Sequence, residues 1–294
     1  MKKSSTRKKK QSILKKYFQE FSFKEGMDFW IIVFNSTVYY LLATFTVLIS
    51  SNFFALLLGS YNNFGGQLFF YGFEIFPIDG HWSQDDIALI FMFGTMFTLF
   101  FAIFFERLYK WRRPYKGNFK LYLLWTYIIG ITWFLGNIIV GAYSNFSVGA
   151  VMDTLRFPMA VRIMISVAVI FLLFYLGRIS RKHVLISGNM YFRLLHSDKN
   201  IWLVKAQLLF PAALGIIAYF IFRSPYQAVY QFRDSLVHLT VFIFILGVFW
   251  GTLQPASIGF KKRKNKVDFD YIALFIMIIM AISIRLYLAE GYTI

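Results

Sequence analysis

The stretch that decides the fold is residues 29–58, FWIIVFNSTVYYLLATFTVLISSNFFALLL, which carries no charged side chain. A helix needs about 20 apolar residues to cross the hydrocarbon core of a bilayer, so this stretch can span it with residues to spare for a tilt. It is also far longer than the apolar core of a signal peptide, and no small-residue cleavage site follows it. We therefore interpret it as an uncleaved first membrane span.

Six further apolar runs follow the first, at residues 87–105, 121–140, 161–176, 201–222, 236–253 and 271–288. Apolar residues make up 58% of the chain and charged residues only 15%, whereas about a quarter of a soluble domain is charged. Because so few charged groups cannot cover this much apolar surface, lipid must surround the protein. The sequence predicts an all-α, polytopic transmembrane helix bundle over residues 29–294, with about seven spans.

The basic residues alternate between the loops in a way that predicts an orientation. Lys and Arg are concentrated before residue 28 and in the segments 106–120, 178–200 and 256–270. By the positive-inside rule these segments are cytosolic, which places the amino terminus in the cytosol and the carboxy terminus outside. Abundant Lys, Ile, Phe and Asn with scarce Pro and Cys is typical of AT-rich bacterial genomes. We therefore expect the cell inner (plasma) membrane of a bacterium.

Residues 1–28 form a basic cytosolic tail. Its apolar residues from Ile13 to Phe21 recur at helical spacing, which predicts an amphipathic helix lying on the inner leaflet; a disordered basic tail is the alternative. Five lysines of this tail are expected to bind anionic lipid: Lys8, Lys9, Lys10, Lys15 and Lys16. The net charge of +17 does not indicate nucleic acid, because the basic residues lie in short blocks between apolar runs.

The predicted outer side carries the ionisable residues that could form a site. Arg162 and Arg285 lie inside apolar runs near their outer ends, and His238 follows Asp234 by one helical turn. Ionisable groups in a span usually point toward a partner or a wet cavity. These four residues predict an outward-facing pocket for an anionic or polar ligand. The alternative is that these residues form structural ion pairs, such as Arg285 with Asp234 or Glu290, while arginine side chains extend to the membrane–water interface.

No catalytic motif accompanies these residues. His-Glu-x-x-His, Gly-x-Ser-x-Gly and phosphate-binding glycine loops are absent from the sequence, and there is no cysteine. We expect neither a metal nor a cofactor. The prediction is a non-enzymatic multi-pass membrane protein that acts as a structural or accessory subunit of a membrane complex or as a pseudo-enzyme scaffold. The alternatives are a small transporter or channel, and a membrane-embedded hydrolase or transferase that uses Asp153, Asp234 or His238.

Two local features modify the simple picture of straight helices. Residues 59–86 are rich in glycine and aromatic residues, so we expect this loop to fold back against the bundle, dip into the interface or offer a partner surface. Pro211, followed by small residues, predicts a kink in the fifth span.

One stretch suggests a family. The sequence pattern of the later spans resembles that of relatives of the site-2-type (M50) intramembrane metallopeptidases. The residues that carry it are Gly136-Asn137, Val148-Gly149-Ala150, Pro158 and Pro211 to Gly215. The long first helix resembles theirs too, and the resemblance covers about half the chain. In that family the first helix carries His-Glu-x-x-His and a later Gly-Asp adds a carboxylate. Here the corresponding places read Leu48 to Phe54 and Gly149-Ala150, so the resemblance implies a degenerate scaffold without zinc ligands.

Overall fold

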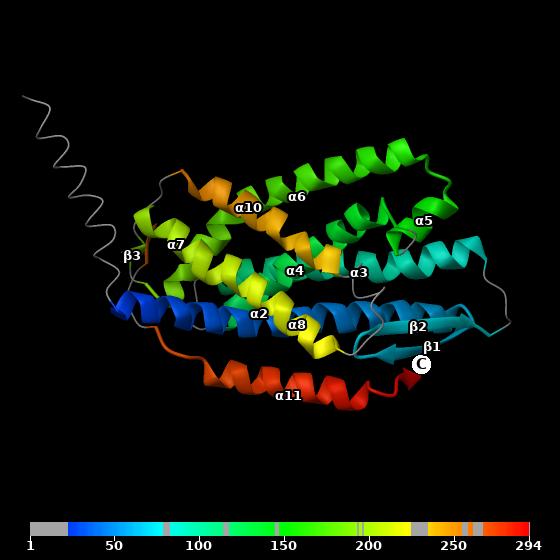
Figure 1. Ribbon diagram of the computed structural model, residues 1–294, viewed down its shortest axis with the longest axis horizontal. Coiled ribbons are helices and arrows are strands. Elements are labelled where there is room, and N and C mark those ends of the chain that lie inside the picture. The colour runs from blue at the N-terminus through cyan, green and yellow to red at the C-terminus, as the bar shows by residue number, and fades with distance from the viewer. Residues whose placement is uncertain are drawn as a thin grey trace, which may run out of the picture.

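The computed structural model describes residues 23–78, 83–113, 118–144, 147–192, 194–195, 197–224, 235–254, 258–260 and 267–293. These residues form a bundle of long, roughly aligned helices with a small β-sheet at one end (Figure 1). The helices are α2 (Phe23–Tyr61), α3 (Gln84–Arg112), α4 (Phe119–Gly141), α5 (Val148–Thr154), α6 (Met159–Ser187), α7 (Asn200–Val204), α8 (Phe210–Arg223), α10 (Val241–Thr252) and α11 (Tyr271–Tyr287).

Within the described part of the chain, six helices are apolar and long enough to cross a membrane. They run over Gly26–Tyr61, Leu89–Arg112, Phe119–Gly141, Met159–Met190, Asn200–Arg223 and Ser235–Thr252. The predicted helical class is therefore confirmed, and the six helices are compatible with a multi-pass membrane protein. The last predicted span is the shorter, 17-residue α11, so the count of seven crossings and their orientation stay predictions.

The predicted fourth span, 161–176, is shorter than the helix that contains it. α6 continues past its apolar part to Ser187, through Arg178, Arg181 and Lys182. Hydropathy ends a span where charges begin, but charged residues with long unbranched side chains are good helix formers, so the helix does not stop there.

Within the helical fold, residues 59–86 contain a β-hairpin. β1 (Phe64–Phe69) pairs antiparallel with β2 (Gly72–Pro77), and the distant β5 (Tyr292–Thr293) adds a third strand in the order β2-β1-β5. Alternate residues of β1, including Phe64 and Leu68, are buried. The hairpin thus packs one face of β1 inward and defines what we call the hairpin end of the bundle. A two-stranded pair, β3 (Leu194–Leu195) with β4 (Ile258–Gly259), lies at the opposite end (Figure 1).

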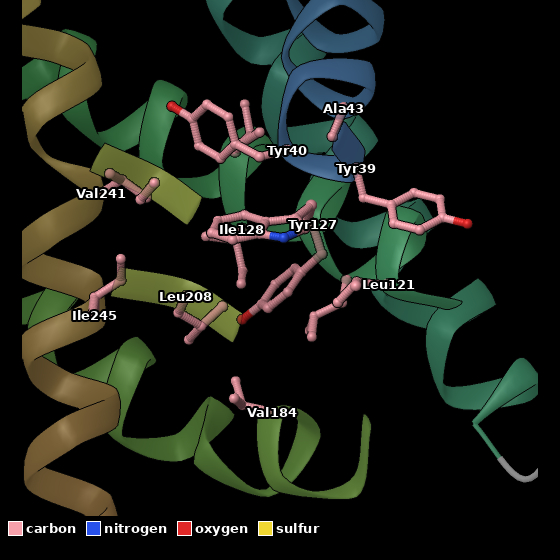
Figure 2. Packing of buried hydrophobic residues seen from close by; sticks show 14 of the residues in the cluster. Tyr39, Tyr40, Ala43, Leu121, Tyr127, Ile128, Val184, Leu208, Val241 and Ile245 are labelled. Carbon is pink, nitrogen blue, oxygen red and sulfur yellow. The ribbon is translucent and has the colours of Figure 1, made fainter. Parts of the chain in front are cut away.

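The bundle is centred on apolar and aromatic side chains from α2, α4, α8 and α10. Figure 2 shows a part of this cluster in which Tyr40, Ile128, Leu208 and Val241 come from four different segments. The side chains of α6 and α11 that point away from it are mostly exposed and apolar. Such faces are expected where lipid surrounds the protein.

A buried polar contact joins α2 to the helix that contains Pro211. The backbone forms a π-helical turn at Lys205–Leu209 (η3) between α7 and α8. Proline has no N–H, so the carbonyl of Gln207, four residues earlier, lacks its α-helical donor. The hydroxyl of Ser36 donates to that oxygen at 2.6 Å and accepts from the indole N–H of Trp125 at 2.8 Å. A π-helical turn thus lies directly before Pro211, a side chain of α2 satisfies the freed carbonyl, and the kink itself stays a prediction.

A second polar contact fixes the start of α11. The Asp270 carboxylate accepts hydrogen bonds from Tyr39 Oη at 2.7 Å, Asn118 Nδ2 at 2.6 Å and the Ala273 N–H at 3.1 Å. Partial burial opposes ionisation, but the hydrogen bonds from Tyr39, Asn118 and Ala273 outweigh it and hold the pKa of this carboxyl below its usual value. Asp270 therefore caps α11 and ties it to α2 and α4.

α6 and α10 approach each other through glycine. A Cβ on Gly177 would lie 2.1 Å from the carbonyl oxygen of Phe244, and one on Gly247 would lie 2.0 Å from that of Phe174. Small residues at a helix contact allow backbones to approach closely, which strengthens van der Waals packing where lipid removes the hydrophobic drive.

Gly177→Ala should therefore destabilise the protein by about 1–3 kcal/mol, because α6 and α10 must move apart. Thermal unfolding in a mild detergent measures this. Gly26→Ala is the matched control, since nothing lies within 4 Å of a Cβ there. Equal unfolding temperatures for the two variants would show that the backbones are not in close contact.

Candidate functional site

A cavity of about 690 Å³ opens at the hairpin end. Its walls come from α2, α3, α4, α8, the β-hairpin and Ser147, which precedes α5. Most lining residues are apolar or aromatic, and the polar ones are Ser51, Asn52, Glu74, Thr95, Asn137, Ser147 and Arg223. An apolar cavity of this size with a few convergent polar groups is the usual form of a small-molecule site.

Arg223 is the cationic residue among the described lining residues. It is the last residue of α8 and only 2% exposed. Its guanidinium donates to the carbonyl oxygen of Tyr71 in the hairpin turn and lies 5.5 Å from the ring centroid of Tyr219. These contacts place a buried positive charge between α8 and the hairpin.

The serine and threonine hydroxyl groups of the cavity form hydrogen bonds within the protein. Ser51 donates to Gly94 O at 2.8 Å, and Thr95 donates to Phe91 O at 3.0 Å. The Thr95 and Ser147 oxygens are 3.3 Å apart, and either hydroxyl can be the donor in that pair. The oxygens of these three groups can also accept from a ligand.

Asn52, Asn137 and Trp133 are neutral lining residues whose side chains carry N–H groups. The Nδ2 of Asn137 donates to Trp133 O at 2.9 Å. An amide nitrogen carries two hydrogens, and one such bond uses one of them. Asn137 is almost fully buried, so any ligand that it meets is also away from bulk water.

His238, predicted as a site residue, lies directly behind the aromatic wall of the cavity. Its ring centroid is 4.7 Å from that of Trp133 and 4.8 Å from that of Tyr219, and both of those residues line the cavity. The side chain is 4% exposed, and its Nε2 has no hydrogen-bond partner within the described part of the chain. His238 thus supports the wall, separated from the cavity by two rings.

Arg285, also predicted as a site residue, holds the end of α8. It donates to Phe222 O at 2.6 Å and Ser224 O at 3.0 Å, the two residues that flank Arg223, and its guanidinium lies 4.1 Å from the ring centroid of Phe70. The last carbonyls of a helix lack intrahelical donors, and a cation there is favourable for the helix dipole. Arg285 therefore positions Arg223 and the cavity wall.

Arg162, another predicted site residue, makes its described contacts away from the cavity. Arg162 forms an ion pair with Asp153 and donates from Nε to Phe157 O at 2.9 Å, which fixes the turn between α5 and α6. Asp234 lies outside the described residues, as do the tail lysines that the sequence predicts to bind lipid. The predicted cluster of Arg162, Asp234, His238 and Arg285 is therefore not assembled by any contact described here.

Sequence reasoning missed Arg223 as the cationic centre of the site. It stands at the end of an apolar run, where an arginine that reaches the interface is the ordinary interpretation. The signal that could have found it is its nearness to Tyr219 and to the aromatic stretch 69–73, but that nearness exists only in the folded chain.

Comparisons with known proteins add no relative. No family model matches the sequence, and neither the curated proteins nor the solved structures gave a significant match. The resemblance to site-2-type metallopeptidases therefore stays a prediction. Among the described residues, no group of three or more His, Cys, Asp or Glu could hold a metal ion.

Replacing Arg285 with Leu should lower the free energy of unfolding by about 1–3 kcal/mol, because it removes two charge-assisted hydrogen bonds to the end of α8. Chemical or thermal unfolding in detergent gives the value. Arg178→Leu, an exposed arginine of α6, is the matched control and should change stability by less than about 0.5 kcal/mol. Equal stability of the Arg285→Leu and Arg178→Leu variants would show that the hydrogen bonds of Arg285 do not stabilise the end of α8.

Proposed function

We propose that this chain is a non-enzymatic, seven-span membrane protein that binds a small amphipathic ligand in the cavity at the hairpin end. The observation that carries the proposal is the cavity itself, about 690 Å³ in volume and lined by aromatic rings with one buried guanidinium. A purely structural helix bundle has no need for such a space, because packed interiors leave few voids larger than a water molecule.

The arrangement of α11 supports a seventh crossing. It lies alongside α2 over its length (Figure 1). It begins next to Asp270, which accepts a hydrogen bond from Tyr39 of α2, and near its end Arg285 donates to the carbonyl of Phe222 in α8. A tilted or locally thinned bilayer accommodates a hydrophobic helix of 17 residues. With the basic segments in the cytosol, the hairpin end and its cavity face outward in a bacterial inner membrane.

A role as an accessory subunit and a role in transport both use such a site. The observation that favours transport is the interrupted helix formed by α7, the π turn at Lys205–Leu209 and α8. Transporters commonly build their sites from broken helices near the middle of the membrane. Here the break and Arg223 belong to the same chain segment, so movement at the break would move the cavity wall.

The predicted kinship with degenerate metallopeptidases is compatible with this proposal. The part of α2 that the resemblance places at the zinc motif supplies Leu48, Ile49, Ser51 and Asn52 to the cavity. A scaffold that lost its metal ligands and kept the space would bind a ligand without hydrolysing it.

Photolabelling tests the proposal. A neutral alkyl probe, decanol with a diazirine in its chain, is added to the purified protein in lipid nanodiscs, and labelled peptides are identified by mass spectrometry. We expect saturable labelling in 45–55 and 69–75, competed by excess decanol. The lipid-facing side of α6 serves as the internal control and should be labelled in proportion to probe concentration. Labelling confined to such lipid-facing surfaces would refute a ligand-binding cavity.

A further inference from the structure

We infer that the cavity at the hairpin end selects its ligand by length. It takes a medium-chain amphiphile whose polar head lies beneath the hairpin and whose apolar chain ends at Phe45. This inference rests on the proposed function, and it adds the class of the ligand and the residue that limits its length. It follows from the order in which polar and apolar residues line the cavity along the helices.

The helices that run toward the hairpin end carry their polar lining residues nearer to the hairpin than their apolar ones. These helices are α2, α4 and α8 (Figure 1). The pairs, written from the deeper residue to the one nearer the hairpin, are Phe45 and Ser51 on α2, Trp133 and Asn137 on α4, and Tyr219 and Arg223 on α8. An amphiphile that lies parallel to the helices, with its head toward the hairpin, matches this order.

Neutral polar side chains of α2, α3 and the start of α5 lie at one depth in the cavity. Ser51 donates to the carbonyl oxygen of Gly94 at 2.8 Å, so α2 and α3 are level there. The hydroxyl of the next residue, Thr95, lies 3.3 Å from that of Ser147. We call Ser51, Asn52, Thr95 and Ser147 the polar layer. Hydroxyl and amide groups act as both donors and acceptors, so this layer suits the head of an amphiphile.

Aromatic rings close the cavity at its deep end. Among the described lining residues, Phe45 is the deepest of α2 and Tyr219 the deepest of α8, and their ring centroids are 6.2 Å apart. Both side chains are almost fully buried. One turn deeper, α8 touches α2, because a Cβ on Gly215 would lie 2.1 Å from the ring of Tyr40. A chain that enters the cavity therefore ends at these rings.

The distance from the polar layer to the aromatic rings sets the length of chain that fits. Ser51 stands six positions after Phe45, and a helix rises about 1.5 Å per residue, which gives about 9 Å. Leu48 and Ile49 line the space between them. One leaflet of a bilayer has a hydrocarbon depth of about 15 Å, half of the whole core. The chain of a bilayer lipid is therefore too long for this space, whereas a medium-length chain fits.

A series of 1-alkanols from butanol to hexadecanol, titrated against the photoprobe in nanodiscs, tests the length limit. The compounds share one head, and affinities refer to the measured free aqueous concentration. We expect the affinity to rise about fourfold with each methylene group among the shorter members, because each is buried against an apolar wall. The rise should stop between hexanol and dodecanol. An affinity that rises without a break to hexadecanol would overturn the length limit and leave cavity binding intact, whereas the absence of saturable labelling would remove both proposals.

Variants of Phe45 test which residue sets the limit. Phe45→Ala removes the ring at the deep end, so the break should move to longer alkanols and the affinity for dodecanol relative to hexanol should rise by about tenfold. Phe100→Ala is the matched control, since Phe100 of α3 is 59% exposed, and its break should stay where it is in the wild type. If Phe45→Ala does not fold, Phe45→Leu should move the break in the same direction. An unchanged break in the Phe45 variant that folds would contradict the assignment to this residue.

Discussion

The hydrogen bond from Ser36 to the carbonyl of Gln207 is the contact on which the centre of the bundle depends. In a bilayer no water satisfies a backbone group that has lost its partner, so a proline inside a span needs a donor from a neighbouring helix. Pro211 creates that need, and Ser36 meets it at 2.6 Å while it accepts from Trp125 at 2.8 Å. One hydroxyl group thus joins α2, α4 and the broken helix.

The hairpin end depends on a connected set of contacts from segments far apart in the sequence. Arg285 of α11 binds the carbonyls on both sides of Arg223, and Arg223 donates to Tyr71 in the hairpin turn. β5, which follows α11, adds a strand to the same hairpin. α11 therefore contributes to the cavity although it does not line it, and its loss would free both the end of α8 and the third strand of the sheet.

Much of the fold could be predicted from the sequence because the hydrophobic runs are long and nearly free of charge. The helices α2, α3 and α4 follow from these apolar runs, and a π-helical turn lies just before Pro211, where the sequence predicted a kink. The β-hairpin was harder to predict, since Gly65-Gly66 and the aromatic residues after them suit several loop structures. Its pairing with Tyr292–Thr293 joins residues more than 200 positions apart, and no local pattern encodes such a contact.

The site was predictable only in part, for a physical reason. The side chain of an arginine near the end of an apolar run either extends to the membrane interface or is buried in a contact within the protein. Which of the two occurs depends on the residues that neighbouring helices place beside it. Arg162 forms an ion pair with Asp153, Arg285 donates to a carbonyl at the end of α8, and Arg223 lines the cavity. The close approach at Gly177 was likewise invisible, because a glycine in a helix reveals a contact only when its partner is known.

The most direct test of a seven-span bundle with its hairpin end outside is cysteine accessibility, which the absence of native cysteine makes clean. Single cysteines replace the exposed residues Ser60, Ser197 and Glu290, and intact cells are treated with a membrane-impermeant maleimide. The seven-span arrangement predicts labelling at positions 60 and 290 in intact cells, and at position 197 only after the membrane is permeabilised. Protection of position 290 together with position 197 would contradict it, because α11 would then not cross the membrane.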